Sequence, residues 1–332
     1  MLTMNNGSPQ FDKATTKRMA LRTISQNPIE CTPGQEKSEK LDTRDFPVES
    51  IDCWIQGELD VAGTVTLKDG GLYRFLKFLE VARNGNDTFF RVPGDMLPTL
   101  HRLVTNQAPP VRHAGLTAGD SGKFSAYFKL PFDIGGYNSL ADFTADQSCD
   151  FNIDTAPLSD VMESGTATVS NFKLAMTPKI IEGGEVGKLG GVGANYLKPF
   201  YRVSSEPVKQ NQVDMTFDLT AGRGYHLLML VGYKDGERDD SIIKSVKLER
   251  ADKSHVKLTA DEIRDINQVE YELGTGTVPA EMKGVLVVPF VKPGHPEHTQ
   301  SIAPSQSMKL ICEVEKDTGN QEIKLLQGYF RF

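Results

Sequence analysis

The alternation of apolar and polar residues follows one plan at two places in the chain. The stretches 77–103 and 244–269 align with a single one-residue gap near Phe90. Each stretch predicts a strand, a polar turn, a second strand and a short helix. Because spacing, turn and helix agree, we interpret the match as a duplicated domain. The aligned pairs are Lys77 with Lys244, Leu79 with Val246, Val81 with Leu248, Arg83 with Arg250, Phe89 with Val256, Val92 with Leu258, Asp95 with Asp261, Leu97 with Ile263, Leu100 with Ile266, and Leu103 with Val269.

The local signals are alike in the two copies. Strand residues alternate with period two, and polar turns follow at 84–87 and 251–254. In the second copy, Thr259 and Glu262 have the spacing of a capping box at the start of a helix. In the first copy, Asp95 occupies the first helical turn, where an acid suits the helix dipole. Both helices keep apolar residues at every third position.

Alternating segments elsewhere predict further strands, with glycine-rich or proline-rich turns between them. Leu130-Pro131-Phe132 at the end of one segment is echoed by Val288-Pro289-Phe290 at the end of another. The expected organisation is a polar N-terminal arm at 1–45, a first β domain with longer loops at 46–182, a glycine-rich linker at 183–195 and a second β domain at 196–332.

The composition agrees with a two-domain β protein. The chain of 332 residues has 30 glycines, 18 prolines and 39% hydrophobic residues, enough for two cores. A formal net charge of −7 argues against a general nucleic-acid-binding protein. The four cysteines have no metal-site or disulfide-framework spacing, which predicts buried or partly buried thiols in a reducing cytoplasm. They are Cys31, Cys53, Cys149 and Cys312.

No catalytic motif stands out, so we expect a protein that is not an enzyme and has no cofactor. His295, Glu297 and His298 are close in sequence, but their spacing matches no helical zinc motif. A solvated loop is the favoured interpretation, and no metal site is expected. Gly187-Lys188 lacks the preceding glycine and the following Ser or Thr of a phosphate loop.

The N-terminal arm contains a basic segment interleaved with apolar residues. Its basic residues are Lys13, Lys17, Arg18 and Arg22. One interpretation is an amphipathic segment that touches an anionic membrane or nucleic acid. The other is a flexible arm that orders against a neighbouring subunit. No secretory signal is expected, and no apolar run approaches the roughly 20 residues that span a bilayer.

The order of these features resembles a known family. In the second half, the strand Ile243-x-x-Val246-x-Leu248 leads through a turn to a helix beginning at Thr259-Ala260-Asp261. Met282 to Val285 follow, then a strand ending in Pro289-Phe290 and a closing hairpin from Met308. This order, with its duplication over 46–332, is similar to the double jelly-roll major capsid proteins of membrane-containing bacteriophages of the corticovirus and tectivirus kind.

The resemblance implies an all-β fold of two tandem eight-stranded jelly-roll sandwiches, each with a short helix after its central hairpin. It also implies a homotrimer, pseudo-hexagonal because three chains carry six sandwiches, that tiles an icosahedral virion shell assembled in the host cytoplasm. Neighbouring capsomers, penton and minor capsid proteins would be its partners, and no specific nucleic acid is expected.

The resemblance further implies roles for segments of the chain. Long loops, with 105–122, 133–165 and 234–241 as candidates, would form outward towers. The basic residues Lys13, Lys17, Arg18 and Arg22 would face an internal lipid membrane or a neighbouring capsomer.

Two other classes of protein remain open. A two-domain β-sandwich module could bind carbohydrate or protein, as a spike or adhesin component does. Exposed aromatic residues on one sheet face would favour this class, but Trp54 is the only tryptophan. A jelly-roll enzyme of the cupin type would need clustered histidines, and the histidines here are scattered.

Overall fold

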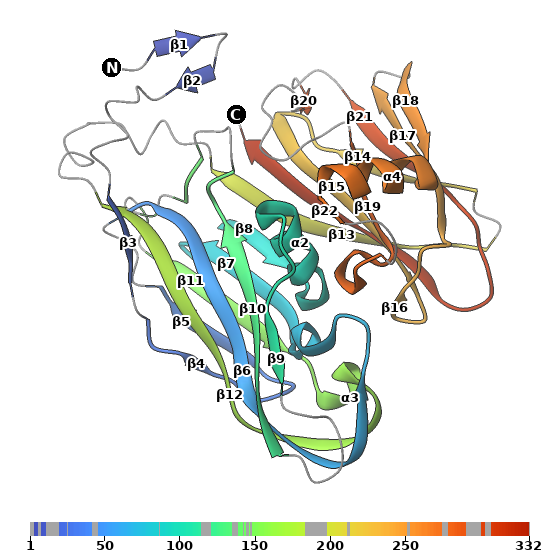
Figure 1. The fold of residues 1–332 in the computed structure, drawn as a ribbon. Helices are drawn as coiled ribbons and strands as arrows, with labels where there is room; N and C mark the ends of the chain where they lie inside the picture. The colour runs from blue at the N-terminus through green and yellow to red at the C-terminus, as the bar shows by residue number, and fades with distance from the viewer. Residues whose placement is uncertain are drawn as a thin grey trace. The chain divides into compact units, whose positions relative to one another are not determined.

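A computed structural model describes the chain, except for a set of short segments, and divides it into two compact units. Unit 1 is Met1–Pro199 and unit 2 is Phe200–Phe332. Each is described by itself below (Figure 1). The residues outside the description are 1–2, 6–7, 11–19, 25, 42–45, 86, 114–120, 135–138, 142, 144–145, 147, 183–197, 211–212, 251–252, 274–277, 290–299, 303–306 and 332.

Two antiparallel sheets make up unit 1. In the first, the long strand β6 (Val48–Leu67) lies between β12 (Met162–Glu182) and β10 (Ser121–Pro131). The second sheet has the order β5-β11-β7-β8. Flanking the first sheet are β3 (Ala20–Thr23) and β4 (Ile29–Glu30) on β12, and β9 (Val111–His113) on β10. The strands of the second are β5 (Glu36–Lys40), β7 (Leu76–Arg83), β8 (Asp87–Val92) and β11 (Cys149–Thr155).

Alternation along the strands puts one face of each sheet of unit 1 into a core. In β11, every second residue from Cys149 is buried. The rings of Phe75 and Phe124 stack in this core with centroids 5.3 Å apart. Gly57 is paired with Phe124 across the sheet. A Cβ at position 57 would be 2.7 Å from the phenylalanine ring, so the ring has room only because this residue is glycine. Short helical elements connect the strands: η1 (Gly71–Phe75), η2 (Gly94–Met96), α2 (Leu97–Thr105) and α3 (Leu158–Val161); the short pair β1 (Thr3–Asn5) and β2 (Ser8–Gln10) precedes them.

Two sheets also make up unit 2. In the first, β15 (Arg223–Lys234) pairs with β22 (Gln321–Arg331), and β13 (Pro199–Pro207) lies on the other side of β22. The second sheet has the order β14-β21-β17-β18. Its strands are β14 (Asp214–Leu219), β17 (Ile243–Arg250), β18 (Lys253–Thr259) and β21 (Met308–Val314). The other elements are β16 (Glu237–Arg238), α4 (Ala260–Glu270), η4 (Ala280–Met282), β19 (Val285–Val287) and β20 (Gln300–Ile302).

The two units share one strand order, which confirms the duplication seen in the sequence. Counting β3 and β4 as one interrupted strand, the eight main strands of unit 1 occur in the order β3/β4, β5, β6, β7, β8, β10, β11, β12. Those of unit 2 are β13, β14, β15, β17, β18, β19, β21, β22. In each unit, strands 1-8-3-6 form one sheet and strands 2-7-4-5 the other. A helix follows the fifth strand both times. This is the arrangement of a jelly roll.

The described part of the segment 1–45 is not all an arm. Residues 20–40 supply β3, β4 and β5, and so the first two strands of the first jelly roll. The sequence signal was weak because β5 is an edge strand. Its residues EKSEK are all exposed, and charged residues at an edge replace the apolar alternation of an interior strand. The described residues on either side of the predicted linker end at Glu182 and resume at Lys198.

The hairpins correct one detail of the sequence alignment. Val81 pairs with Phe90, and Leu248 pairs with Val256, so Phe90 and not Phe89 is the equivalent of Val256. Both hairpins contain a one-residue β-bulge at this point, with Phe89 as the extra residue in one copy. The one-residue gap therefore belongs between the two strands, because the last pair of the hairpin is Arg83 with Asp87 in unit 1 and Arg250 with Lys253 in unit 2.

The helix of unit 2 begins as predicted. The Thr259 hydroxyl accepts a hydrogen bond from the Glu262 backbone N–H at 3.3 Å, and the Glu262 carboxylate accepts one from the Thr259 N–H at 2.7 Å. The buried face of α4 includes Asn267, whose side-chain amide donates to the Val287 carbonyl and accepts from the Val287 N–H, both at 2.9 Å. Within the described chain, no helix is long and apolar enough to cross a membrane.

Candidate functional site

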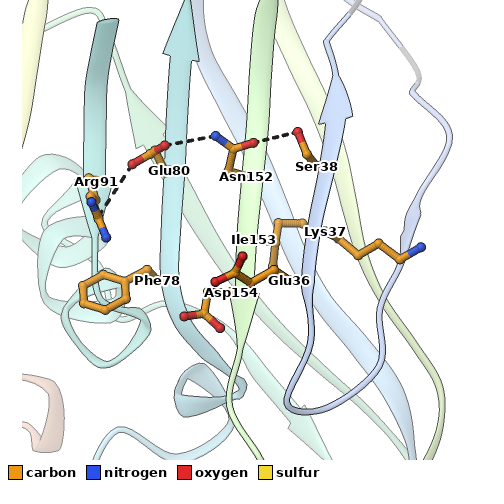
Figure 2. A pocket seen from close by; sticks show the side chains of 9 residues that line it. All are labelled: Glu36, Lys37, Ser38, Phe78, Glu80, Arg91, Asn152, Ile153 and Asp154. Carbon is orange, nitrogen blue, oxygen red and sulfur yellow. Dashed lines mark hydrogen bonds and ion pairs between the residues drawn. The ribbon is translucent and has the colours of Figure 1, made fainter. Parts of the chain in front are cut away.

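The solvent-facing side of the second sheet of unit 1 has a row of polar side chains that crosses four strands. Arg91 on β8 lies 3.6 Å from the Glu80 carboxylate on β7. Glu80 accepts a hydrogen bond from the Asn152 amide on β11 at 3.0 Å, and Asn152 accepts one from Ser38 on β5 at 2.7 Å. Figure 2 shows this row as a continuous line of contacts. The register of the strands places the four residues directly opposite one another.

A second row lies beside the first. Phe78, Asp154 and Glu36 are opposite one another on neighbouring strands. The Arg91 guanidinium stacks over the Phe78 ring, 5.1 Å from its centroid, and Lys77 lies 3.4 Å from the Asp154 carboxylate. The two rows line a shallow, open concavity of about 420 Å³ (Figure 2).

The polar side chains of this surface pair mainly with one another. Donors and acceptors alternate along the first row, and Glu80 and Asp154 each have a cationic neighbour. Among the residues that line the concavity there is no Ser, Cys or Lys nucleophile hydrogen-bonded to a histidine base. A polar surface of a partner protein can pair with such rows.

The outer side of the first sheet of unit 1 carries a second polar cluster. Lys179 on β12 forms an ion pair with Asp52 on β6 at 2.8 Å, and the Tyr127 hydroxyl on β10 donates to Asp52 at 2.6 Å. Burial raises the pKa of the Tyr127 phenol, and its hydrogen bond to Asp52 raises it further. Trp54 packs against Tyr127 with ring centroids 5.3 Å apart and is only partly exposed. The single tryptophan therefore stacks within the protein.

The structure describes only part of the predicted basic segment. Lys13, Lys17 and Arg18 lie outside the described residues. Arg22 lies on β3, opposite Ile180 of β12, with its side chain exposed. The loop with His295, Glu297 and His298 is also outside the described residues. Among the residues described, no group of three or more His, Cys, Asp or Glu side chains is placed to hold a metal ion.

The candidate tower segments contain regular structure where they are described. The segment 133–165 includes β11 and α3, and 234–241 includes β16. Residues 114–120 of the segment 105–122 lie outside the described residues.

The cysteines are free thiols, as the sequence predicts. Cys53, Cys149 and Cys312 are buried and Cys31 is partly buried. Burial raises the pKa of the Cys31 thiol to about 11 and raises that of the other three as well. High thiol pKa values leave little thiolate at neutral pH, so these side chains act as small apolar groups.

Sequence reasoning missed the two polar rows. Each consists of single residues from strands far apart in the chain, and alternation reports only that they face solvent. The one local signal for this surface was the charged sequence EKSEK of β5, in which the pair Glu-Lys occurs twice.

Comparison with known proteins supports the fold directly. No protein-family model matches the chain. No curated protein matches its sequence. Among solved structures, the major capsid protein of Sulfolobus turreted icosahedral virus superposes with a TM-score of 0.72 at 15% identity, over 94% of this chain and 96% of that chain. The major capsid protein P2 of bacteriophage PM2 gives 0.59 at 11% identity, over 94% and 97%. The Faustovirus major capsid protein gives 0.59 at 8% identity, over 100% and 93%.

These structures come from different viruses, so the narrower bacteriophage lineage suggested by the sequence stays a prediction. Their coverage of nearly the whole chain includes both jelly rolls. The chain therefore has the double jelly-roll fold of viral major capsid proteins, as its sequence predicted.

Proposed function

We propose that this protein is a structural major capsid protein of an icosahedral virus. The observation that carries the proposal is the repeat of one jelly roll, with the same strand order and the same helix, in a single chain. A closed ring of three copies would contain six sandwiches, and a pseudo-hexagonal unit of this kind tiles a shell. The double jelly-roll fold shared with capsid proteins of three different viruses supports the same conclusion.

The function is packing, with no reaction and no cofactor. In the proposed homotrimer, side chains on the sheet faces make the contacts between sandwiches. The two polar rows on the second sheet of unit 1, from Arg91 to Ser38 and from Phe78 to Glu36, are surfaces suited to such contacts. Edge strands such as β5 are protected by charge against uncontrolled pairing before assembly.

The assembled protein would form the virion capsid, after assembly in the host cytoplasm. Its partners would be copies of itself, neighbouring capsomers, and penton and minor capsid proteins. An internal lipid membrane lies beneath the shell in this proposal. The basic residues Lys13, Lys17, Arg18 and Arg22 would face that membrane or a neighbouring capsomer.

The solution mass of the purified protein tests this proposal. Light scattering behind a sizing column is expected to give three times the chain mass of 36.6 kDa, and the trimer should survive dilution. Electron microscopy should then show six-lobed particles. A monomer at every concentration would overturn the capsid proposal and favour a monomeric β-sandwich binding module.

A further inference from the structure

The outer side of the first sheet of unit 1 has a third row of polar side chains, which crosses five strands. On the three central strands, the residues before and after the row, such as Phe124 and Leu174, are buried, so the row itself lies on the solvent-facing side. At about 4.8 Å between neighbouring strands, the row is roughly 19 Å long. Its members are Arg112 on β9, Ser125 on β10, Gln56 on β6, Lys173 on β12 and Glu30 on β4, each paired with the next across the sheet.

A β-bulge in β12 adjoins this row. Ser170 pairs with Glu58 and Lys173 pairs with Gln56, so β12 has one residue more than β6 between the two pairs. Asn171, in the bulge, has a φ of 51°, in the left-handed region that asparagine adopts more readily than most residues. Its side-chain amide donates a hydrogen bond to the Glu58 carboxylate at 3.3 Å. The row and the bulge together line a shallow, open concavity of about 590 Å³.

The concavity contains more basic than acidic side chains, although the whole chain has a net charge of −7. Its basic residues are Arg112, Lys123 and Lys173, and its acidic residues are Glu30 and Glu58. Within the described part of the chain, the side chains of Arg112 and Lys173 form no hydrogen bond or ion pair. Lys123 is 86% exposed and lies 3.9 Å from the Glu58 carboxylate. These cations are therefore available to the negative charge of a ligand.

The other side chains of the concavity indicate the class of that ligand. Gln56, Ser125 and Asn171 can both donate and accept hydrogen bonds, whereas the carboxylates of Glu30 and Glu58 only accept them. These carboxylates would repel the phosphates of a nucleic acid, but they can accept hydrogen bonds from the hydroxyl groups of a saccharide. A carboxylate on the same saccharide would pair with a guanidinium or ammonium group through charge-assisted hydrogen bonds.

We propose that this concavity binds an acidic saccharide, a chain of sugar units that carry carboxylate groups. Arg112 and Lys173 pair with the carboxylates, and Gln56 and Ser125, which lie between them in the row, bind the hydroxyl groups. The site lies on one sheet face of unit 1, so the inference goes beyond the capsid proposal and does not depend on it. A capsid built from this protein would carry many copies of the site, and multivalency strengthens weak individual binding.

Isothermal titration calorimetry of the full-length protein with tetragalacturonic acid tests the inference. We expect a dissociation constant on the order of 1 mM, because the concavity is shallow and open. The methyl ester of the same saccharide keeps the sugar units without the negative charges, and should bind at least about tenfold more weakly. A single-stranded oligothymidylate of equal charge, as a probe for any polyanion, should also bind at least about tenfold more weakly.

Substitutions in the concavity locate the binding site. Arg112→Gln and, separately, Lys173→Gln should each weaken the binding of tetragalacturonic acid by about tenfold, since each removes a partner of a carboxylate. The matched control is Lys129→Gln, which removes the same charge from the same face of β10 at a residue outside the concavity. This control should bind the saccharide as the unsubstituted protein does. Thermal unfolding followed by circular dichroism should show that all three variants keep the fold.

Three results would each overturn the inference. The first is no binding of tetragalacturonic acid at concentrations of about 10 mM. The second is equal binding of the methyl ester or of the oligothymidylate, which would show that the site does not select an acidic saccharide. The third is an equal effect of Lys129→Gln and the two substitutions in the concavity, which would place the binding elsewhere. The capsid proposal is tested by the solution mass and stands or falls separately.

Discussion

The imidazole of His226 lies directly against Gly328 on the neighbouring strand. A Cβ on Gly328 would be 2.7 Å from Cε1 of His226, closer than such atoms approach in proteins. His226 is the extra residue of a β-bulge between β15 and β22, and its ring packs against Phe330 with centroids 4.7 Å apart. The glycine thus makes the room that the bulged histidine fills.

Gly328→Ala is therefore expected to destabilise unit 2 by about 1–3 kcal/mol, because the added methyl group overpacks a filled core. Urea denaturation measures the free energy of unfolding. The double variant with His226→Ala should cost less than the sum of the two single variants, since removing the ring removes the clash. If the losses in free energy of unfolding of the two single variants simply add in the double variant, the contact between His226 and Gly328 is contradicted.

The buried His226 also predicts how stability depends on pH. Burial lowers the pKa of the His226 imidazole from 6.5 to about 3. Below pH 6.5 the unfolded chain gains a proton that the folded chain does not take up until about pH 3. This group should therefore lower the free energy of unfolding by about 2 kcal/mol between pH 8 and pH 5.

The comparison with His226→Leu isolates this contribution, because all other titrating groups are shared. Denaturation curves at pH 8 and pH 5 should show a smaller loss of stability for the leucine variant. An equal loss in the two proteins would mean that His226 takes up its proton in the folded state as readily as in the unfolded one.

Asn267 joins α4 to the strand β19 through both polar groups of Val287. Asn267→Ala leaves a buried N–H and a buried carbonyl without these partners, so we expect a loss of roughly 2–4 kcal/mol in the free energy of unfolding. Asp265→Ala, at an exposed position of the same helix, is the control and should change stability by less than about 0.5 kcal/mol. Equal effects of the two substitutions would argue against a stabilising role for the two hydrogen bonds between Asn267 and Val287.

Removing the capping box at the start of α4 should lower the free energy of unfolding by a smaller amount. Thr259→Ala removes the hydroxyl that accepts from the Glu262 N–H, and should cost about 1 kcal/mol. Thr259→Ser keeps the hydroxyl and should restore most of that stability. Chemical denaturation of the three proteins measures the difference, and a serine variant as unstable as the alanine variant would show that the cap contributes little.

The sequence predicts those parts of the fold that depend on neighbouring residues. The hairpins around Val81 and Leu248 and the helix after each are visible because alternation, turn and cap are local patterns. The strand β5 was missed because an edge strand of five exposed residues has no apolar face to show. The bulge at Phe89 shifted the alignment by one residue, since a bulge changes the register without changing the apolar content of the strand.

Contacts between distant segments explain the rest. In the sequence, Asn267 looks like an ordinary polar residue of a helix. Its hydrogen bond to β19, twenty residues later, depends on the fold that places the strand beside the helix. The row from Arg91 to Ser38 combines residues from β5, β7, β8 and β11, whose order in the sheet follows from the topology and not from any one segment. The alternation of Leu79 and Val81 predicts that Glu80 points to the opposite face of its strand, but not that Glu80 meets Asn152.

The bulge shared by the two hairpins carries information about the history of the chain. It occurs at the equivalent position after Val81 and after Leu248, where one strand has an extra residue. We infer that an insertion kept at the same register in both copies dates from before the duplication. We infer an ancestor with a single bulged sandwich, which would have needed six separate chains to close the ring that three copies of the present chain are proposed to form.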